Sequence, residues 1–174
     1  LAPDGAHAPA MPAMPRRSVL FWPQSGFVML CGGHVPTQNT FFAQLGLPGL
    51  FHNYHGIVLG VSAGSMNAAH IVYAAPEEPG EAADPHYSRW MNGLGLTETR
   101  ILAPLPVHPG SCAGRTEDGG HRPLPTAKTA FLALPDGSYI LCADGSEALY
   151  GRGWYFADGM MEEINEDEDV LPLR

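Results

Sequence analysis

A serine between two glycines is the feature of this sequence best suited to catalysis. Gly60-Val-Ser-Ala-Gly64 directly follows the apolar run 57–59 and precedes a second apolar segment, 66–75, which is typical of a helix. A strand, a Gly-x-Ser-x-Gly turn and a helix in direct succession form a nucleophile elbow. The turn strains its central residue, and glycines two positions away leave the room that it needs. The spacing predicts a catalytic Ser62; the alternative is a glycine-rich turn in which Ser62 or Ser65 caps the helix.

A second glycine loop is expected beside this serine. The apolar run 27–31 predicts a parallel strand covered on both faces, and it ends in Gly32-Gly33, whose backbone amides could approach a ligand closely. A helix is expected over 40–45, before the strand at 57–61. Neighbouring parallel strands end at the same edge of a sheet, so the right-handed βαβ unit predicted here places the glycine pair next to Ser62.

The rest of the chain predicts an α/β fold, with a largely parallel central sheet, flanking helices and a C-terminal antiparallel meander. Residues 1–26 read as an irregular N-terminal segment and 27–160 as a single α/β domain. Within that domain, 103–128 is an irregular insert rich in proline and glycine, and 161–174 is an acidic tail, expected to be solvated and frayed.

Composition limits the partners that the chain can have. The net charge is -9, with 9 basic and 18 acidic residues, which argues against nucleic acid and anionic membrane surfaces. No apolar run approaches the length of a membrane span. Three cysteines without metal-ligand spacing indicate reduced thiols and a cytoplasmic location, with Cys31 and Cys142 expected in the core.

Four motifs together resemble the dipeptidase E and cyanophycinase family of serine peptidases, which have a class I glutamine-amidotransferase-like fold. They are Cys-Gly-Gly-His-Val-Pro-Thr-Gln-Asn-Thr-Phe-Phe at 31–42, Gly-Val-Ser-Ala-Gly-Ser at 60–65, Gly-Leu-Gly-Leu at 93–96 and Ala-Leu-Pro-Asp-Gly-Ser at 133–138. The resemblance covers roughly 27–102 and 129–160. Family members carry further βα units before the glycine loop, so the chain is expected to be N-terminally truncated relative to them, and 103–128 resembles nothing in the family.

The resemblance implies a catalytic triad in the order Ser, His, Asp, with Ser62 as the nucleophile and Asp136 as the acid. It also implies an oxyanion hole formed by the glycine loop, Gly32 and Gly33, and by the amide of Ala63. Asp136 equally fits the tight turn that Pro-Asp-Gly favours.

The base is the member of the triad that the sequence identifies least clearly. A serine hydroxyl needs a base within hydrogen-bond reach, and that base needs an orienting partner. His108 is the predicted base and His121 the second candidate, and each also fits a solvated loop residue. His70, in the segment after the elbow, is interpreted as structural.

These features predict a cytoplasmic serine peptidase that hydrolyses short peptides through an acyl-enzyme. No metal or cofactor is expected, the partner is a small peptide substrate, and the chain is a monomer or a homodimer. The alternative is a catalytically inactive or vestigial homologue that acts at most as a binding protein. An esterase is a third possibility, separated from a peptidase by its substrates.

Overall fold

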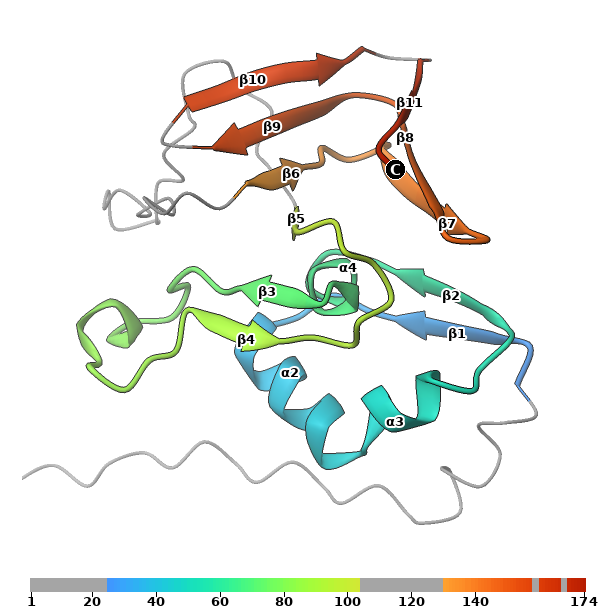
Figure 1. Ribbon diagram of the computed structural model, residues 1–174. Helices are drawn as coiled ribbons and strands as arrows, with labels where there is room; N and C mark the ends of the chain where they lie inside the picture. Colours follow the sequence, from blue (N-terminus) through green and yellow to red (C-terminus); the bar gives the residue numbers. More distant parts are fainter. Residues whose placement is uncertain (1–24, 104–129, 158–159, 167–168) are drawn as a thin grey trace, which may run out of the picture.

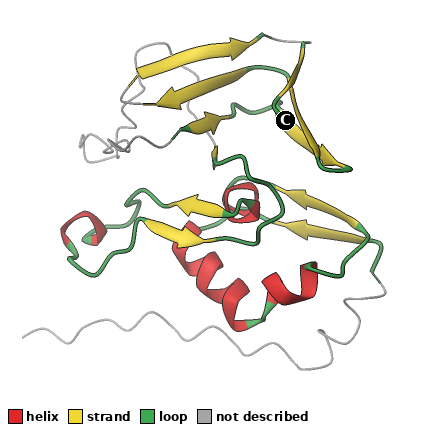
Figure 2. Ribbon diagram, in the orientation of Figure 1, coloured by secondary structure: helices red, strands yellow, loops and turns green. Residues whose placement is uncertain are grey.

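The computed structural model describes residues 25–103, 130–157, 160–166 and 169–174, and these form small sheets and three short α-helices (Figures 1 and 2). In chain order the elements are β1 (Phe27–Leu30), α2 (Val35–Gln44), α3 (Leu47–Phe51), β2 (Ile57–Gly60), α4 (Ala63–Ala68), β3 (Ile71–Tyr73), the 3-10 helix η2 (Glu81–Ala83), β4 (Trp90–Asn92), β5 (Ile101–Leu102), β6 (Phe131–Ala133), β7 (Tyr139–Ala143), β8 (Ser146–Tyr150), β9 (Gly153–Ala157), β10 (Met160–Asn165) and β11 (Val170–Pro172).

The strand that precedes the glycine loop and the strand that precedes the serine form a parallel pair, as predicted. β1 and β2 run in register from Phe27 opposite Ile57 to Leu30 opposite Gly60. Below this pair in Figure 1 lie α2 and α3, which contribute Phe42, Leu47 and Phe51 to a core shared with the inward-facing residues of β1. The segment from β1 through the two helices to β2 therefore fixes where both strands end.

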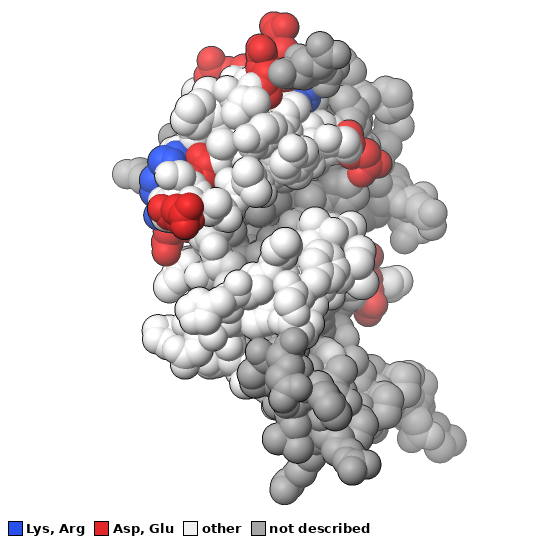
Figure 3. Space-filling view, turned by 90° about the vertical axis from the view of Figure 1, so that its right-hand side faces the viewer, with Lys and Arg blue, Asp and Glu red and all other residues white. Residues whose placement is uncertain are grey.

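The expectation that β1 is covered on both faces is wrong. Its residues alternate between exposed and buried, so only one face packs against the helices. On the other face Phe27 and Met29 are half exposed, and Ile57 on β2 is 68% exposed. Figure 3 shows the molecule from the side on which β1 and β2 begin and the β7–β8 turn lies. The middle of this view has no charged residue.

The predicted fold class, a largely parallel central sheet with flanking helices, is also wrong. In the described residues only β1–β2 and β5–β6 are parallel strand pairs, and they belong to different sheets. A parallel connection needs a crossover of about a dozen residues or more. The helix that follows the elbow, α4, spans only 6 residues and ends at Ala68, whereas a helix over 66–75 was expected. The next strand, β3, therefore pairs antiparallel with β4 instead of extending the β1–β2 sheet.

The C-terminal strands are divided between two sheets and do not form one meander. One sheet has the order β10-β9-β6-β5, and the other has the order β11-β8-β7. In both, all pairs except β5–β6 are antiparallel. The acidic segment supplies β10 and β11, so the expectation of a frayed C-terminus is wrong: β10 pairs with β9, and β11 pairs with β8.

Two further expectations concern the burial of the cysteines and the presence of membrane-spanning segments. Cys31 and Cys142 are exposed free thiols and do not lie in the core as predicted. Of the helices in the described residues, none has the length and apolar character that crossing a membrane requires.

The C-terminal sheet of β7, β8 and β11 is tied to the rest of the molecule through a buried carboxylate. Glu147, on β8, is 3% exposed. Its carboxylate accepts hydrogen bonds from the Thr99 hydroxyl and the Glu98 amide, and it forms an ion pair with Arg174 at 3.3 Å. Burial acts to raise the pKa of this carboxyl, but hydrogen bonds from Thr99 and Thr97, with Arg174 nearby, hold the pKa below its usual range.

Replacing this carboxylate should cost stability in a pH-dependent way. We expect Glu147→Gln to lower the free energy of unfolding by about 1–3 kcal/mol at neutral pH, because the amide cannot satisfy the same donors and cation. The folded-state pKa is depressed, so the contribution of the carboxylate exists above the unfolded-state pKa and disappears as the pH falls through the folded-state pKa. The difference between the two proteins should therefore shrink on acidification. Urea unfolding at neutral pH and at about pH 3 measures it.

The exposed Glu162 on β10 provides the control for this experiment. Glu162→Gln should change stability by no more than about 0.5 kcal/mol at either pH. A Glu147→Gln protein as stable as the parent at neutral pH would contradict the role assigned to the buried carboxylate.

Candidate functional site

The backbone at Ser62 has the strained conformation expected of a nucleophile elbow. Its φ is 52° and its ψ is -120°, a combination that residues with a side chain rarely adopt. The turn is closed by hydrogen bonds from Gly64 to the Val61 carbonyl and from Ser65 to the Ser62 carbonyl, both at 2.9 Å. The Ser65 hydroxyl adds a further bond to the same carbonyl at 2.6 Å. Neither serine has a side-chain hydrogen bond typical of an N-cap within the described residues, which favours the elbow interpretation of Ser62.

The two glycines of the motif are required by close backbone contacts. A Cβ on Gly60 would lie 2.8 Å from the Cα of Ser65. A Cβ on Gly64 would clash with the Leu30 carbonyl and would lie 2.8 Å from the carbonyl oxygen of Cys31. The start of α4 therefore packs directly on the end of β1, which is possible only without side chains at these positions.

The glycine loop after β1 lies beside the serine, as the parallel strand pair predicts. A Cβ on Gly32 would be 3.3 Å from the Cβ of Ser62 and 3.6 Å from its hydroxyl oxygen. Gly33 has a φ of +148°, a conformation that favours glycine. Ala63 follows the serine and is buried, with an exposed fraction of 1%. In the described part of the chain, neither the amide of Gly33 nor that of Ala63 donates a hydrogen bond to another backbone group.

A buried carboxamide connects the glycine loop to the helix of the elbow. Asn67, on α4, has no exposed surface. Its Oδ1 accepts a hydrogen bond from Asn39 at 2.9 Å, and its Nδ2 donates to the Val35 carbonyl at 3.2 Å. The same Nδ2 donates to Oε1 of Gln38 at 3.0 Å, and Gln38 donates to the Cys31 carbonyl at 2.7 Å. The loop that carries Gly32 and Gly33 is thus held to α4, the helix that follows Ser62.

The described part of the structure does not place a predicted catalytic partner beside Ser62. His108 and His121 lie outside those residues. Asp136 is exposed in the turn between β6 and β7, where the Ser138 amide bonds to the Pro135 carbonyl. His70 is exposed between α4 and β3. Within the described part of the chain, the Ser62 hydroxyl forms no hydrogen bond.

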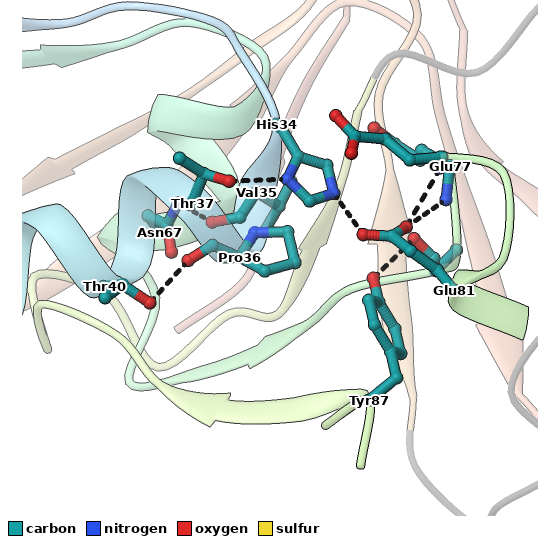
Figure 4. Close-up of polar contacts among 11 residues, drawn as sticks. His34, Val35, Pro36, Thr37, Thr40, Asn67, Glu77, Glu81 and Tyr87 are labelled. Atoms are coloured by element: carbon teal, nitrogen blue, oxygen red, sulfur yellow. Dashed lines mark hydrogen bonds and ion pairs between the residues drawn. The ribbon is translucent and has the colours of Figure 1, made fainter. Parts of the chain in front are cut away.

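A histidine next to the glycine loop was not predicted as a functional residue. His34 follows Gly33 directly, and its imidazole is held between Thr37 and Glu81 (Figure 4). Nearby, burial and the charges of Glu81 and Glu77 raise the pKa of Tyr87 to about 12. The sequence gives one signal for this cluster, the histidine immediately after a glycine pair. The acidic partners, Glu78 and Glu81, follow β3 and are far from His34 in the sequence.

Comparison with known proteins adds no family to these observations. No protein-family model and no curated protein matches this sequence. The resemblance to the dipeptidase E family therefore stays a prediction that depends on the quoted motifs.

Adding one methyl group to the elbow tests its packing. We expect Gly64→Ala to lower the free energy of unfolding by more than about 2 kcal/mol, because the new Cβ overlaps carbonyl oxygens of β1 that cannot move independently. The matched control is Gly49→Ala on α3, where a Cβ meets nothing within 4 Å. That control should be neutral or stabilising by up to about 1 kcal/mol. Thermal or urea unfolding of both variants gives the comparison, and equal stability of the two would show that the elbow is not packed as described.

Proposed function

We propose that this chain is a serine hydrolase of the dipeptidase E type, which cleaves short peptides through an acyl-enzyme formed on Ser62. The observation that carries the proposal is the conformation of Ser62, with φ at 52° and ψ at -120°, in contact range of Gly32. Such strain is retained where a function requires it, because an unstrained turn would be more stable. In a nucleophile elbow, a turn of this kind presents the serine hydroxyl where a substrate carbonyl can reach it.

The proposed reaction has two steps. The Ser62 hydroxyl attacks the scissile carbonyl while a base, proposed to be His108, accepts its proton. The amides of Ala63 and Gly33 stabilise the oxygen anion of the tetrahedral intermediate. The protonated base then donates its proton to the departing amine, and a water molecule hydrolyses the acyl-enzyme with the same base. Asp136 is the proposed orienting acid.

A catalytically inactive homologue that binds a peptide is the second candidate function. The exposed position of Asp136 favours it, since an acid in a solvated turn orients an imidazole poorly. This candidate keeps the elbow and the glycine loop as a binding site and predicts no acyl-enzyme.

A fluorophosphonate probe separates the two functions. It reacts with serines that an adjacent base activates, so we expect the full chain to be labelled once. Ser62→Ala should abolish labelling and peptide hydrolysis. The free energy of unfolding should be unchanged or slightly raised, because a strained elbow is retained for function and not for stability. Labelling followed by mass spectrometry and unfolding curves measures both effects.

The control is Ser88→Ala, an exposed serine on the loop before β4. It should be labelled like the parent. His108→Ala should remove labelling, whereas His121→Ala should retain it if His108 is the base. A folded chain that is never labelled contradicts the hydrolase and supports the binding protein. Turnover of p-nitrophenyl acetate without cleavage of any short peptide would instead indicate an esterase.

A further inference from the structure

An imidazole nitrogen beside the glycine loop faces a carboxylate without a hydrogen bond to it. The Nδ1 of His34 lies 2.8 Å from the Thr37 hydroxyl, which fixes the orientation of the ring. The Nε2 on the opposite side lies 2.9 Å from Oε1 of Glu81. This Nε2 is buried, and in the described structure its position relative to Glu81 does not meet the geometry of a hydrogen bond. The Nε2 is therefore in ion-pair contact with a carboxylate oxygen but has no partner with hydrogen-bond geometry in the described structure.

The carboxylate of Glu81 is positioned by its own backbone neighbours. Its Oε2 accepts hydrogen bonds from the amides of Glu77 at 2.8 Å and of Glu78 at 3.0 Å. Its other oxygen is thereby left pointing at the imidazole, as Figure 4 shows. Glu78 adds a second carboxylate: one ligand atom from each of His34, Glu78 and Glu81 lies within 4.8 Å of the others.

The three side chains, one histidine and two glutamates, are of the types that bind divalent transition metals. One imidazole nitrogen and two carboxylate oxygens suit Zn²⁺ and related divalent transition metals, whereas Ca²⁺ and Mg²⁺ are bound by oxygen ligands alone. A ligating histidine usually donates its other N–H to a neighbouring group, and the Thr37 hydroxyl is in place for that bond. With Nδ1 protonated in this way, the lone pair of Nε2 faces the two carboxylates.

We propose that His34, Glu78 and Glu81 form a binding site for a divalent transition metal of the Zn²⁺ class. The metal connects the start of α2 to the segment that carries Glu78 and Glu81, and it neutralises the charges of their two carboxylates. Three protein ligands leave a coordination position open for water or for an anionic group of a ligand. The proposal is independent of the function proposed for Ser62, because none of the three ligands belongs to that mechanism.

Zinc titration of the full chain tests the site. The protein is stripped of metal with EDTA, dialysed and titrated with ZnCl₂ by calorimetry and in competition with a chromophoric chelator. We expect one Zn²⁺ per chain, bound in the micromolar range or tighter, and a raised melting temperature when Zn²⁺ is in excess. His34→Gln and Glu81→Gln should each weaken binding by at least about tenfold.

Three matched variants define what the result means. His52→Gln and Glu98→Gln change an exposed histidine and an exposed glutamate elsewhere, and both should bind Zn²⁺ like the parent. Cys31→Ser should also bind normally, which excludes a site formed by the exposed thiol. Circular dichroism checks that each variant folds. Thr37→Val, which keeps all three ligands, should weaken binding by a smaller factor than loss of a ligand.

Co²⁺ substitution provides a readout that does not depend on variants. Bound by nitrogen and oxygen ligands, Co²⁺ should give visible d–d bands without a thiolate charge-transfer band. No Zn²⁺ binding at tens of micromolar would overturn the proposal. Binding that is unchanged in His34→Gln, or a thiolate band that is lost in Cys31→Ser, would overturn it equally.

Discussion

The carboxamide of Asn67 is the interaction on which the site depends. It is wholly buried, and both ends of the amide are satisfied, by Asn39 on one side and by Val35 and Gln38 on the other. A satisfied polar network in a low-dielectric interior holds its members in one arrangement, because losing any partner leaves a buried group unpaired. The partners of Asn67 lie on α2, and one of them, Gln38, also donates a hydrogen bond to the Cys31 carbonyl in the loop after β1. The network therefore sets the distance between the glycine loop and the serine, which neither element could fix alone.

Local features of the site could be predicted from the sequence because local sterics determine them. Gly60 and Gly64 are required by contacts within a few residues or with the adjoining strand, so their spacing around Ser62 carries the information directly. The position of Gly32 beside the serine followed from the parallel pairing of two apolar strands. The role of Asn67 was not predictable: an asparagine near the start of a helix looks like any other until its partners, 28 and 32 residues away, are known. His34 was missed for the same reason, since the loop that carries Glu81 is brought to it by the tertiary fold.

The prediction of the fold class was wrong because long-range strand pairing determines the fold class. The apolar runs at β1 and β2 were recognised as strands, but the partners of the later strands depend on connection lengths that periodicity does not report. The early end of α4 at Ala68 redirected β3 into an antiparallel pair, and the acidic C-terminus supplied two strands that charge alone argued against. The exposed apolar residues of β1 and β2 show that hydrophobicity predicted the strands correctly and their burial incorrectly. The predicted site residues show the same division: the strained backbone at Ser62 followed from the local motif, whereas the exposure of Asp136 in its turn did not.

The central claim is that Ser62 is a nucleophile with an oxyanion hole formed by the loop that Asn67 holds in place. A crystal structure of the chain after reaction with a small phosphonylating inhibitor tests it most directly, since the adduct resembles the tetrahedral intermediate. The account predicts a phosphorus bonded to the Ser62 oxygen, with one phosphoryl oxygen about 2.7–3.1 Å from the amide nitrogens of Gly33 and Ala63. An adduct on another residue, or a phosphoryl oxygen that points to solvent and away from both amides, would contradict it.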